Sequence, residues 1–250
     1  MGNSNCLESS RKYPLPVNIN NPNMRNIIIK SWSKENILAS DNCSSQNTPS
    51  STLNSDLIEK AANLINEYFI EKQIKNICVL ELFAGNCCAS LITHNTLQNL
   101  LDTIQTPNWR CTDIVNYNNL PNLPTNIIFD ELHCVDAVAR YGPNANVLLL
   151  ISPPPHSAPR DNKKNDGDLG YGDYYACHDF ITQTLELETF VTKYIIFVGE
   201  LGASDGSEGM YLYLTTHKNL NLLERAMLDE GEDPFGGPIE KELFIFEIHV

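Results

Sequence analysis

The sequence predicts a three-layer α/β protein, in which helices cover both faces of a seven-stranded, mostly parallel sheet with an antiparallel C-terminal strand. Continuous apolar runs, such as 146–151 and 193–198, are typical of strands that are buried on both faces. These runs alternate with segments of helical periodicity, and the alternation implies parallel strands joined by right-handed crossovers. The last two apolar runs, 220–227 and 243–249, are joined through a Pro- and Gly-rich turn, which favours a closing antiparallel pair.

The remaining elements follow from the same periodicities. Asn54 or Ser55 can cap a first helix, whose apolar residues recur at helical spacing as far as Phe69. Residues 207–218 are ambiguous between a helix and a strand, although Asp205-Gly206-Ser207-Glu208 could start a helix. Between the first helix and this segment we expect strands at 77–82, 109–114, 131–135, 146–151 and 193–198, and helices at 89–101, through 137–141, and at 174–191.

Residues 1–53 differ in composition from residues 54–250. They are rich in Asn and Ser and poor in periodic apolar residues, so we expect a flexible segment followed by one α/β domain. Gly2 and Cys6 partly match an acylation pattern, and a lipid anchor there is the alternative to a plain tail. The sequence has neither an apolar run of about 18 residues nor a secretory signal, so no transmembrane helix is expected.

The charge and the cysteines exclude several classes of function. The chain has 17 Lys and Arg against 31 Asp and Glu, a net charge of −14, which argues against strong non-specific nucleic-acid binding. Its eight cysteines include no C-x-x-C pair, and no histidine has metal-ligand spacing with a partner. We therefore expect reduced thiols, no metal site and a cytoplasmic location.

Unusual residues stand at the predicted carboxyl ends of the strands, where such sheets bind ligands. Glu81 lies near the end of the first strand, where a carboxylate suits an amine-bearing ligand, and Gly85 permits a tight turn close to a ligand. Asp113 ends the second strand and can accept two hydrogen bonds from a ribose diol. Asp136 follows the third predicted strand, although it could simply begin a helix. Only one glycine, Gly85, is present in the turn after the first strand, so a pyrophosphate cofactor, as in a dehydrogenase, is disfavoured.

The fourth strand runs into Ser152-Pro153-Pro154-Pro155. Consecutive prolines fix φ and lack amide donors, so we expect a stiff, extended floor at this strand end. A long polar loop, 156–173, leaves from it and is either a lid over the site or a solvated loop.

Taken together, residues 54–250 resemble the seven-stranded, Rossmann-like (class I) S-adenosylmethionine-dependent methyltransferase family. Glu81-Leu82-Phe83-Ala84-Gly85 resembles its glycine-bearing first motif, Asp113 its ribose-binding acid and Asp136 its adenine-proximal acid. Ser152-Pro153-Pro154 resembles the [D/N/S]-P-P motif of amino-group methyltransferases, whose first residue contacts the target nitrogen. The resemblance implies S-adenosylmethionine as cofactor, bound by Glu81, Phe83, Ala84, Gly85, Asp113 and Asp136, with Ser152, Pro153 and Pro154 as the catalytic residues.

Two positions depart from the family pattern. Asn86 stands where many members have a further glycine, and Pro155 stands where an aromatic residue usually follows the two prolines. The alternative to a methyltransferase is therefore a catalytically inactive binding or scaffold module on the same fold. The methyl acceptor, whether small molecule, nucleic acid or protein, is not specified by these residues.

Overall fold

A computed structural model of the chain describes residues 55–113, 121–153, 172–187, 191–200, 205–232 and 238–249. Four sequence-based expectations fall outside these residues. They are the flexible segment 1–53, the acylation of Gly2 and Cys6, the contacts of Pro154, and all but the last two residues of the 156–173 loop.

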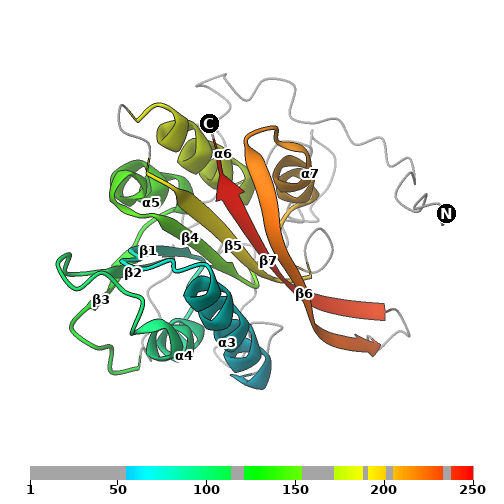
Figure 1. Ribbon diagram of the computed structural model, residues 1–250, viewed down its shortest axis with the longest axis horizontal. Helices are drawn as coiled ribbons and strands as arrows, with labels where there is room; N and C mark the ends of the chain where they lie inside the picture. Colours follow the sequence, from blue (N-terminus) through cyan, green and yellow to red (C-terminus); the bar gives the residue numbers. More distant parts are fainter. Residues whose placement is uncertain are drawn as a thin grey trace, which may run out of the picture.

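Seven strands form one sheet in the order β3-β2-β1-β4-β5-β7-β6 (Figure 1). The strands β1 to β5 pair in parallel, whereas β7 is antiparallel to both β5 and β6. The predicted mostly parallel sheet with an antiparallel C-terminal strand is therefore confirmed. The strands are β1 (Val79–Leu82), β2 (Trp109–Asp113), β3 (Ile127–Glu131), β4 (Val147–Ile151), β5 (Lys193–Gly199), β6 (Leu220–Glu232) and β7 (Pro238–Ile248).

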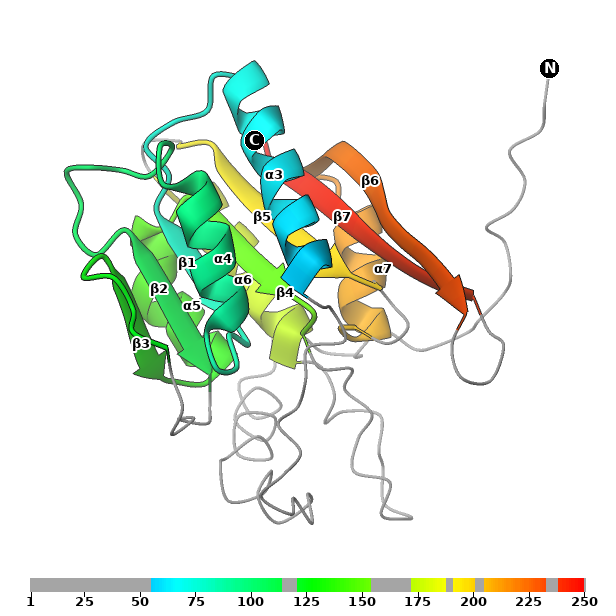
Figure 2. The ribbon, with the colours of Figure 1, turned by 90° about the horizontal axis from the view of Figure 1, so that it is seen from below.

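Helices cover both faces of the sheet (Figure 2). On one face lie α3 (Ser55–Glu71) and α4 (Cys88–Leu97), and on the other lie α5 (Cys134–Tyr141), α6 (Gly172–Leu185) and α7 (Glu208–Thr216). Side chains alternate between the two faces along each strand, so Val79 packs in the first core and Leu80 in the second. All residues of β4 and β5 are buried, as their continuous apolar sequences predict.

Two segments differ from the sequence-based expectations. The third strand is Ile127–Glu131 rather than 131–135, because the short run Ile127-Ile128-Phe129 already forms it and a helix begins at Cys134. The His133 ring caps that helix by accepting the N–H of Val135 at 3.2 Å. The ambiguous segment 207–218 forms α7, because the Ser207 hydroxyl accepts the N–H of Met210 at 3.1 Å.

The strand order reverses between β1 and β4. Later strands along the chain extend outward from β4, whereas β2 and β3 extend in the other direction from β1. Loops at the carboxyl ends of these two strands diverge to opposite faces, which is where open α/β sheets bind their ligands. A ligand site is therefore expected at the carboxyl ends of β1, β2, β4 and β5.

Candidate functional site

The turn that follows β1 has an unusual backbone. Phe83, Gly85 and Cys87 have φ of 60°, 55° and 61°, so every second residue lies in the left-handed region. Gly85 adopts this region at little cost, whereas Phe83 and Cys87 each cost on the order of 1–2 kcal/mol. The turn is closed by two hydrogen bonds, from Cys87 N–H to the Ala84 carbonyl and from Ala84 N–H to the Thr112 carbonyl. Strain of this kind is concentrated at functional sites.

Asp113 and Gly85 are brought into direct contact. The N–H of Gly85 donates to Oδ2 of Asp113 at 2.9 Å, so the end of β2 holds the turn that follows β1. A Cβ at Gly85 would meet no atom within 4 Å, so this turn borders open space. A carboxylate can accept about four hydrogen bonds, so Asp113 can accept a ribose diol while it holds Gly85. These two residues therefore fit a nucleoside-bearing cofactor.

Glu81 lies in the core rather than at this rim. Its side chain points to the α3 and α4 face, where Oε2 accepts the indole N–H of Trp109 at 2.9 Å and lies 3.7 Å from Sγ of Cys111. Only 1% of the residue is exposed. Burial raises the pKa of Glu81 to about 7, although its hydrogen bonds lower it in part. Glu81 is thus enclosed in the core instead of exposed at the strand tip, because its position in β1 directs the side chain under α4.

The raised pKa of Glu81 predicts a pH-dependent stability. An unfolded Glu has a pKa of about 4.3, so between pH about 4 and 7 the native state holds a proton that the unfolded state has lost. The free energy of unfolding therefore falls as pH rises through this range, by at most roughly 4 kcal/mol from this residue. In urea titrations at a series of pH values, we expect the free energy of unfolding of the Glu81→Gln variant not to show this decrease. Asp173, whose pKa burial raises to about 6, is present in both proteins and cancels in the comparison. Parallel pH profiles for the two proteins would contradict the expectation.

Asp136 is placed differently from the sequence-based expectation. It lies in the first turn of α5 and is exposed, because the third strand ends five residues earlier, at Glu131. The parallel register puts Glu131 directly beside Asp113. Glu131 is therefore the last residue of β3, whereas the sequence-based expectation placed it at the start of the third strand, 131–135.

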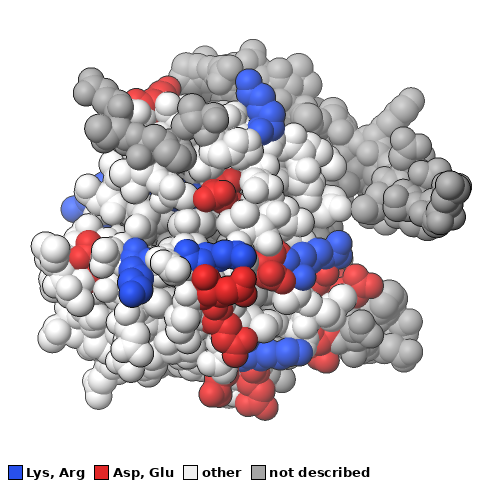
Figure 3. Space-filling view, viewed as in Figure 1, with Lys and Arg blue, Asp and Glu red and all other residues white. Residues whose placement is uncertain are grey.

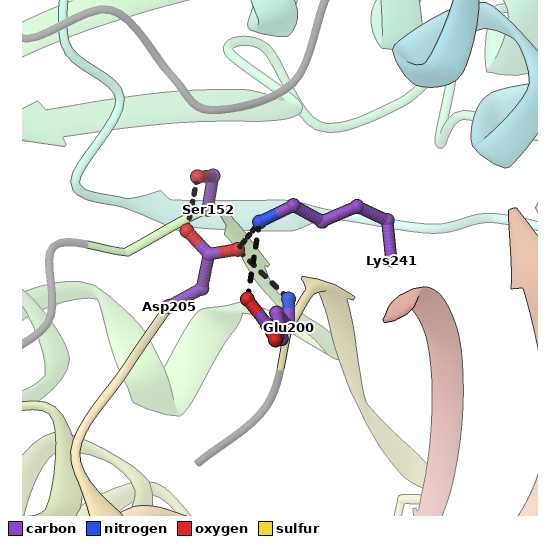
Figure 4. Close-up of polar contacts among 4 residues, drawn as sticks. All are labelled: Ser152, Glu200, Asp205 and Lys241. Carbon is purple, nitrogen blue, oxygen red and sulfur yellow. Dashed lines mark hydrogen bonds and ion pairs between the residues drawn. The ribbon is translucent and has the colours of Figure 1, made fainter. Parts of the chain in front are cut away.

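Ser152 directly follows β4 and is another residue with a strained backbone. Its φ is 45°, and its N–H donates to the carbonyl of Val198 in β5 at 2.7 Å. Its hydroxyl donates to Oδ1 of Asp205 at 2.5 Å (Figure 4). Pro153 is buried, and its carbonyl accepts the N–H of Gly206 at 2.8 Å. The expected stiff floor is thus fixed by the segment that precedes α7.

Asp205 is the centre of a buried polar cluster that sequence analysis missed. The cluster comprises Ser152, Glu200, Asp205 and Lys241 (Figure 4). Oδ2 of Asp205 accepts from the Lys241 ammonium at 2.8 Å and from the Glu200 N–H at 2.8 Å. The Asp205 and Lys241 side chains are 1% and 5% exposed, and the Glu200 carboxylate lies 3.8 Å from Lys241. The close packing of Asp205 requires Gly199, where a Cβ would lie 2.7 Å from Oδ2 and φ is 147°. Gly199, at the end of a buried strand, is the sequence feature that could have indicated this cluster.

A second carboxylate fixes the same segment from the other side. Asp173, in the first turn of α6, accepts the N–H of Ser207 at 2.6 Å and its hydroxyl at 2.8 Å. The site is thus built from two adjoining parts. Gly85, Asp113 and Glu131 border the carboxyl ends of β1 to β3. Ser152, Asp205 and Lys241 border the carboxyl ends of β4 and β5 and the start of the antiparallel strand β7.

Some absences can be stated for the described residues alone. Among them, no three His, Cys, Asp or Glu side chains converge as metal ligands. No helix in the described part of the chain is long and apolar enough to cross a membrane. On the face drawn in Figure 3, lysines and arginines lie singly or beside acidic residues.

The strand order, the parallel β1 to β5 and the antiparallel β7 between β5 and β6 define the class I, Rossmann-like methyltransferase fold. No protein-family profile and no curated protein matches the sequence. Solved structures of methyltransferases do match, at low identity. An rRNA methylase from Streptococcus thermophilus is 10% identical, with 80% of this chain and 100% of that chain covered and a TM-score of 0.44. Magnesium protoporphyrin IX methyltransferase from Synechocystis, with bound S-adenosylmethionine, is 6% identical, with 91% and 97% covered and a TM-score of 0.44.

The plantazolicin methyltransferase, in complex with the demethylated cofactor, is 12% identical, with 91% of this chain and 97% of that chain covered and a TM-score of 0.41. At these identities the likeness concerns the fold alone.

Proposed function

We propose that this chain is an S-adenosylmethionine-dependent methyltransferase that binds its cofactor at the ends of β1 and β2. The observation that carries the proposal is the contact between Gly85 and Asp113, which joins the ends of β1 and β2 beside the point where the strand order reverses, between β1 and β4. A carboxylate at the end of β2 beside an open, left-handed glycine turn suits a ribose diol and the chain attached to it. The bound cofactor supplies an electrophilic methyl group on a sulfonium.

The residues of this chain would bind and orient the two reactants. Asp113 would hold the ribose, and the backbone of Phe83, Ala84 and Gly85 would pack beneath the cofactor. Because Glu131 ends β3 beside Asp113, we assign the adenine side to Glu131 in place of Asp136. Glu81 would support the turn from below, through Trp109.

Ser152 would position the methyl acceptor. Its hydroxyl has one proton, which it donates to Asp205, so toward an acceptor it can only accept a hydrogen bond from an N–H or O–H. The strained backbone and the bond to Val198 fix its position, and methyl transfer depends mainly on such positioning. Pro153 would provide a rigid floor, and we propose the same for Pro154.

Calorimetric titration of the purified chain with S-adenosylmethionine and with its demethylated product tests the cofactor assignment. We expect saturable heat with both ligands, and none with NAD. If neither ligand gives heat at about 1 mM, a concentration that would reveal even weak specific binding, the proposal is refuted.

A binding module without transfer is the second candidate. It is favoured by Pro155 in place of an aromatic residue and by the enclosure of Glu81 in the core. This candidate predicts that labelled methyl groups from S-adenosylmethionine reach no acceptor in small-molecule, RNA or protein fractions, even where the calorimetric titration shows binding.

A further inference from the structure

A hollow opens at the amino-terminal edge of the sheet, opposite the proposed cofactor site. Its volume is about 320 Å³, which lies at the lower end of the range for small-molecule sites. It is formed by the start of β1, the segment 105–108 that leads into β2, and the end of α5 with the 3₁₀ turn Gly142–Asn144. Parallel strands begin at this edge and end at the Gly85 and Asp113 rim, so the hollow is separate from the proposed cofactor site.

The side chains that line this hollow differ in charge from the chain as a whole. Two arginines, Arg110 and Arg140, line it, and none of its lining residues in the described part of the chain is an Asp or Glu. The chain, in contrast, has 31 acidic residues against 17 basic ones. Gln105, Thr106 and Asn144 add amide and hydroxyl donors. The lining therefore suits an anion rather than a cation.

Arg110 is held in one orientation. Its guanidinium lies 4.2 Å from the centroid of the Tyr141 ring, and Nη1 donates to Oδ2 of Asp130 at 3.0 Å. The side chain is 28% exposed, so the charge is partly removed from water. A guanidinium has five N–H groups in a fixed plane, and the bond to Asp130 uses only one of its nitrogens, Nη1. Arg110 is thus preorganised to donate to a further anionic group.

Arg140 brings a second positive charge to the same ring. Its guanidinium lies 5.1 Å from the Tyr141 centroid, and among the described residues it forms no ion pair. The two guanidiniums repel each other, and Asp130 compensates only one of them. Asp102, the other carboxylate close by, accepts the backbone N–H groups of Ile104 and Gln105. An anion between the two arginines would relieve the repulsion and could be bound in bidentate fashion.

We propose that this hollow binds a phosphate monoester of a small organic molecule. The phosphate would lie between Arg110 and Arg140. Because the hollow is larger than one phosphate and is also lined by Val79, Pro107 and Ala145, the organic part would pack against these apolar residues. The site does not depend on the proposed methyltransferase function.

Titration of the full chain in phosphate-free buffer, followed by amide NMR shifts and calorimetry, tests the site. The probes are ribose 5-phosphate, inorganic phosphate and ribose. We expect ribose 5-phosphate to bind more tightly than inorganic phosphate, ribose not to bind, and the shifts to cluster at 105–110 and 140–145. Arg140→Gln should weaken binding about 10-fold or more, since a hydrogen bond to a charged group contributes roughly 1.5–3 kcal/mol.

The matched control is Arg225→Gln, because Arg225 also lies over an aromatic ring, 5.4 Å from the Phe244 centroid, but far from the hollow. This variant should bind ribose 5-phosphate like the unaltered chain. Three results would overturn the proposal. The first is the absence of shifts at about 10 mM ribose 5-phosphate, a concentration well above a millimolar dissociation constant. The others are an equal loss of affinity in both variants, and binding of inorganic phosphate without binding of ribose 5-phosphate. Calorimetry with S-adenosylmethionine on the same samples reports on the other edge of the sheet separately.

Discussion

Replacing Lys241 by methionine is expected to lower the free energy of unfolding by about 3–5 kcal/mol, because Asp205 is left charged and buried without its cation. Two other donors to Asp205, the Ser152 hydroxyl and the Glu200 N–H, do not carry a full charge. Urea denaturation at neutral pH measures the change. Combining Lys241→Met with Asp205→Asn should restore part of the loss, since the buried charge is then removed as well.

Arg225→Met is the control for this experiment. Arg225 also forms an ion pair from the antiparallel strands, with Glu242 at 2.7 Å, but its side chain is 53% exposed. Exposed pairs contribute about 0–1 kcal/mol, so this variant should lose little. A similar loss in both variants would show that the Asp205 and Lys241 pair is not the buried anchor described here.

Replacing Asp113 by alanine is expected to weaken S-adenosylmethionine binding about 100-fold. Two hydrogen bonds from the ribose diol to a carboxylate would be lost, each contributing roughly 1.5–3 kcal/mol, and the Gly85 turn would lose its anchor. Calorimetry measures the change in the dissociation constant.

Asp113→Asn provides the comparison, because its amide oxygen can still accept the Gly85 N–H while the charge is gone. We expect a smaller loss, about 10-fold. If the alanine variant binds as tightly as the unaltered chain, Asp113 holds only the turn and the ribose assignment is wrong, even where the chain binds the cofactor.

The fold was predictable where hydrophobic periodicity is strong. Residues 147–151 and 194–198 are apolar or aromatic because helices cover these strands on both faces, and such runs are typical of buried strands. The third strand was misplaced because it is an edge strand with only Ile127, Ile128 and Phe129 as apolar residues, and Ile128 is exposed. The residue at the end of the third strand is therefore Glu131, and Asp136 lies in the first turn of α5.

The candidate site was predictable only where it follows a strand in the sequence. Gly85, Asp113 and Ser152 lie at or just after the carboxyl ends of strands that the sequence predicts, so their common edge could be inferred. The pairing of Asp205 with Lys241 depends on how β7 inserts beside β5, with Gly199 opposite Glu242. No local pattern specifies that register. The direction of the Glu81 side chain likewise depends on which face α4 covers.

The position of Lys241 has a consequence for the order in which the molecule folds. Lys241 belongs to β7, which takes its place between β5 and β6, although Ser152 lies 89 positions earlier in the chain (241 − 152). The contact between Asp205 and Lys241 is therefore expected to form late, because contacts between distant positions incur a loop-closure entropy cost before they contribute stability. Intermediates that lack the inserted strand would leave Asp205 without its ammonium partner, so this buried ion pair and the completed sheet would form in the same step.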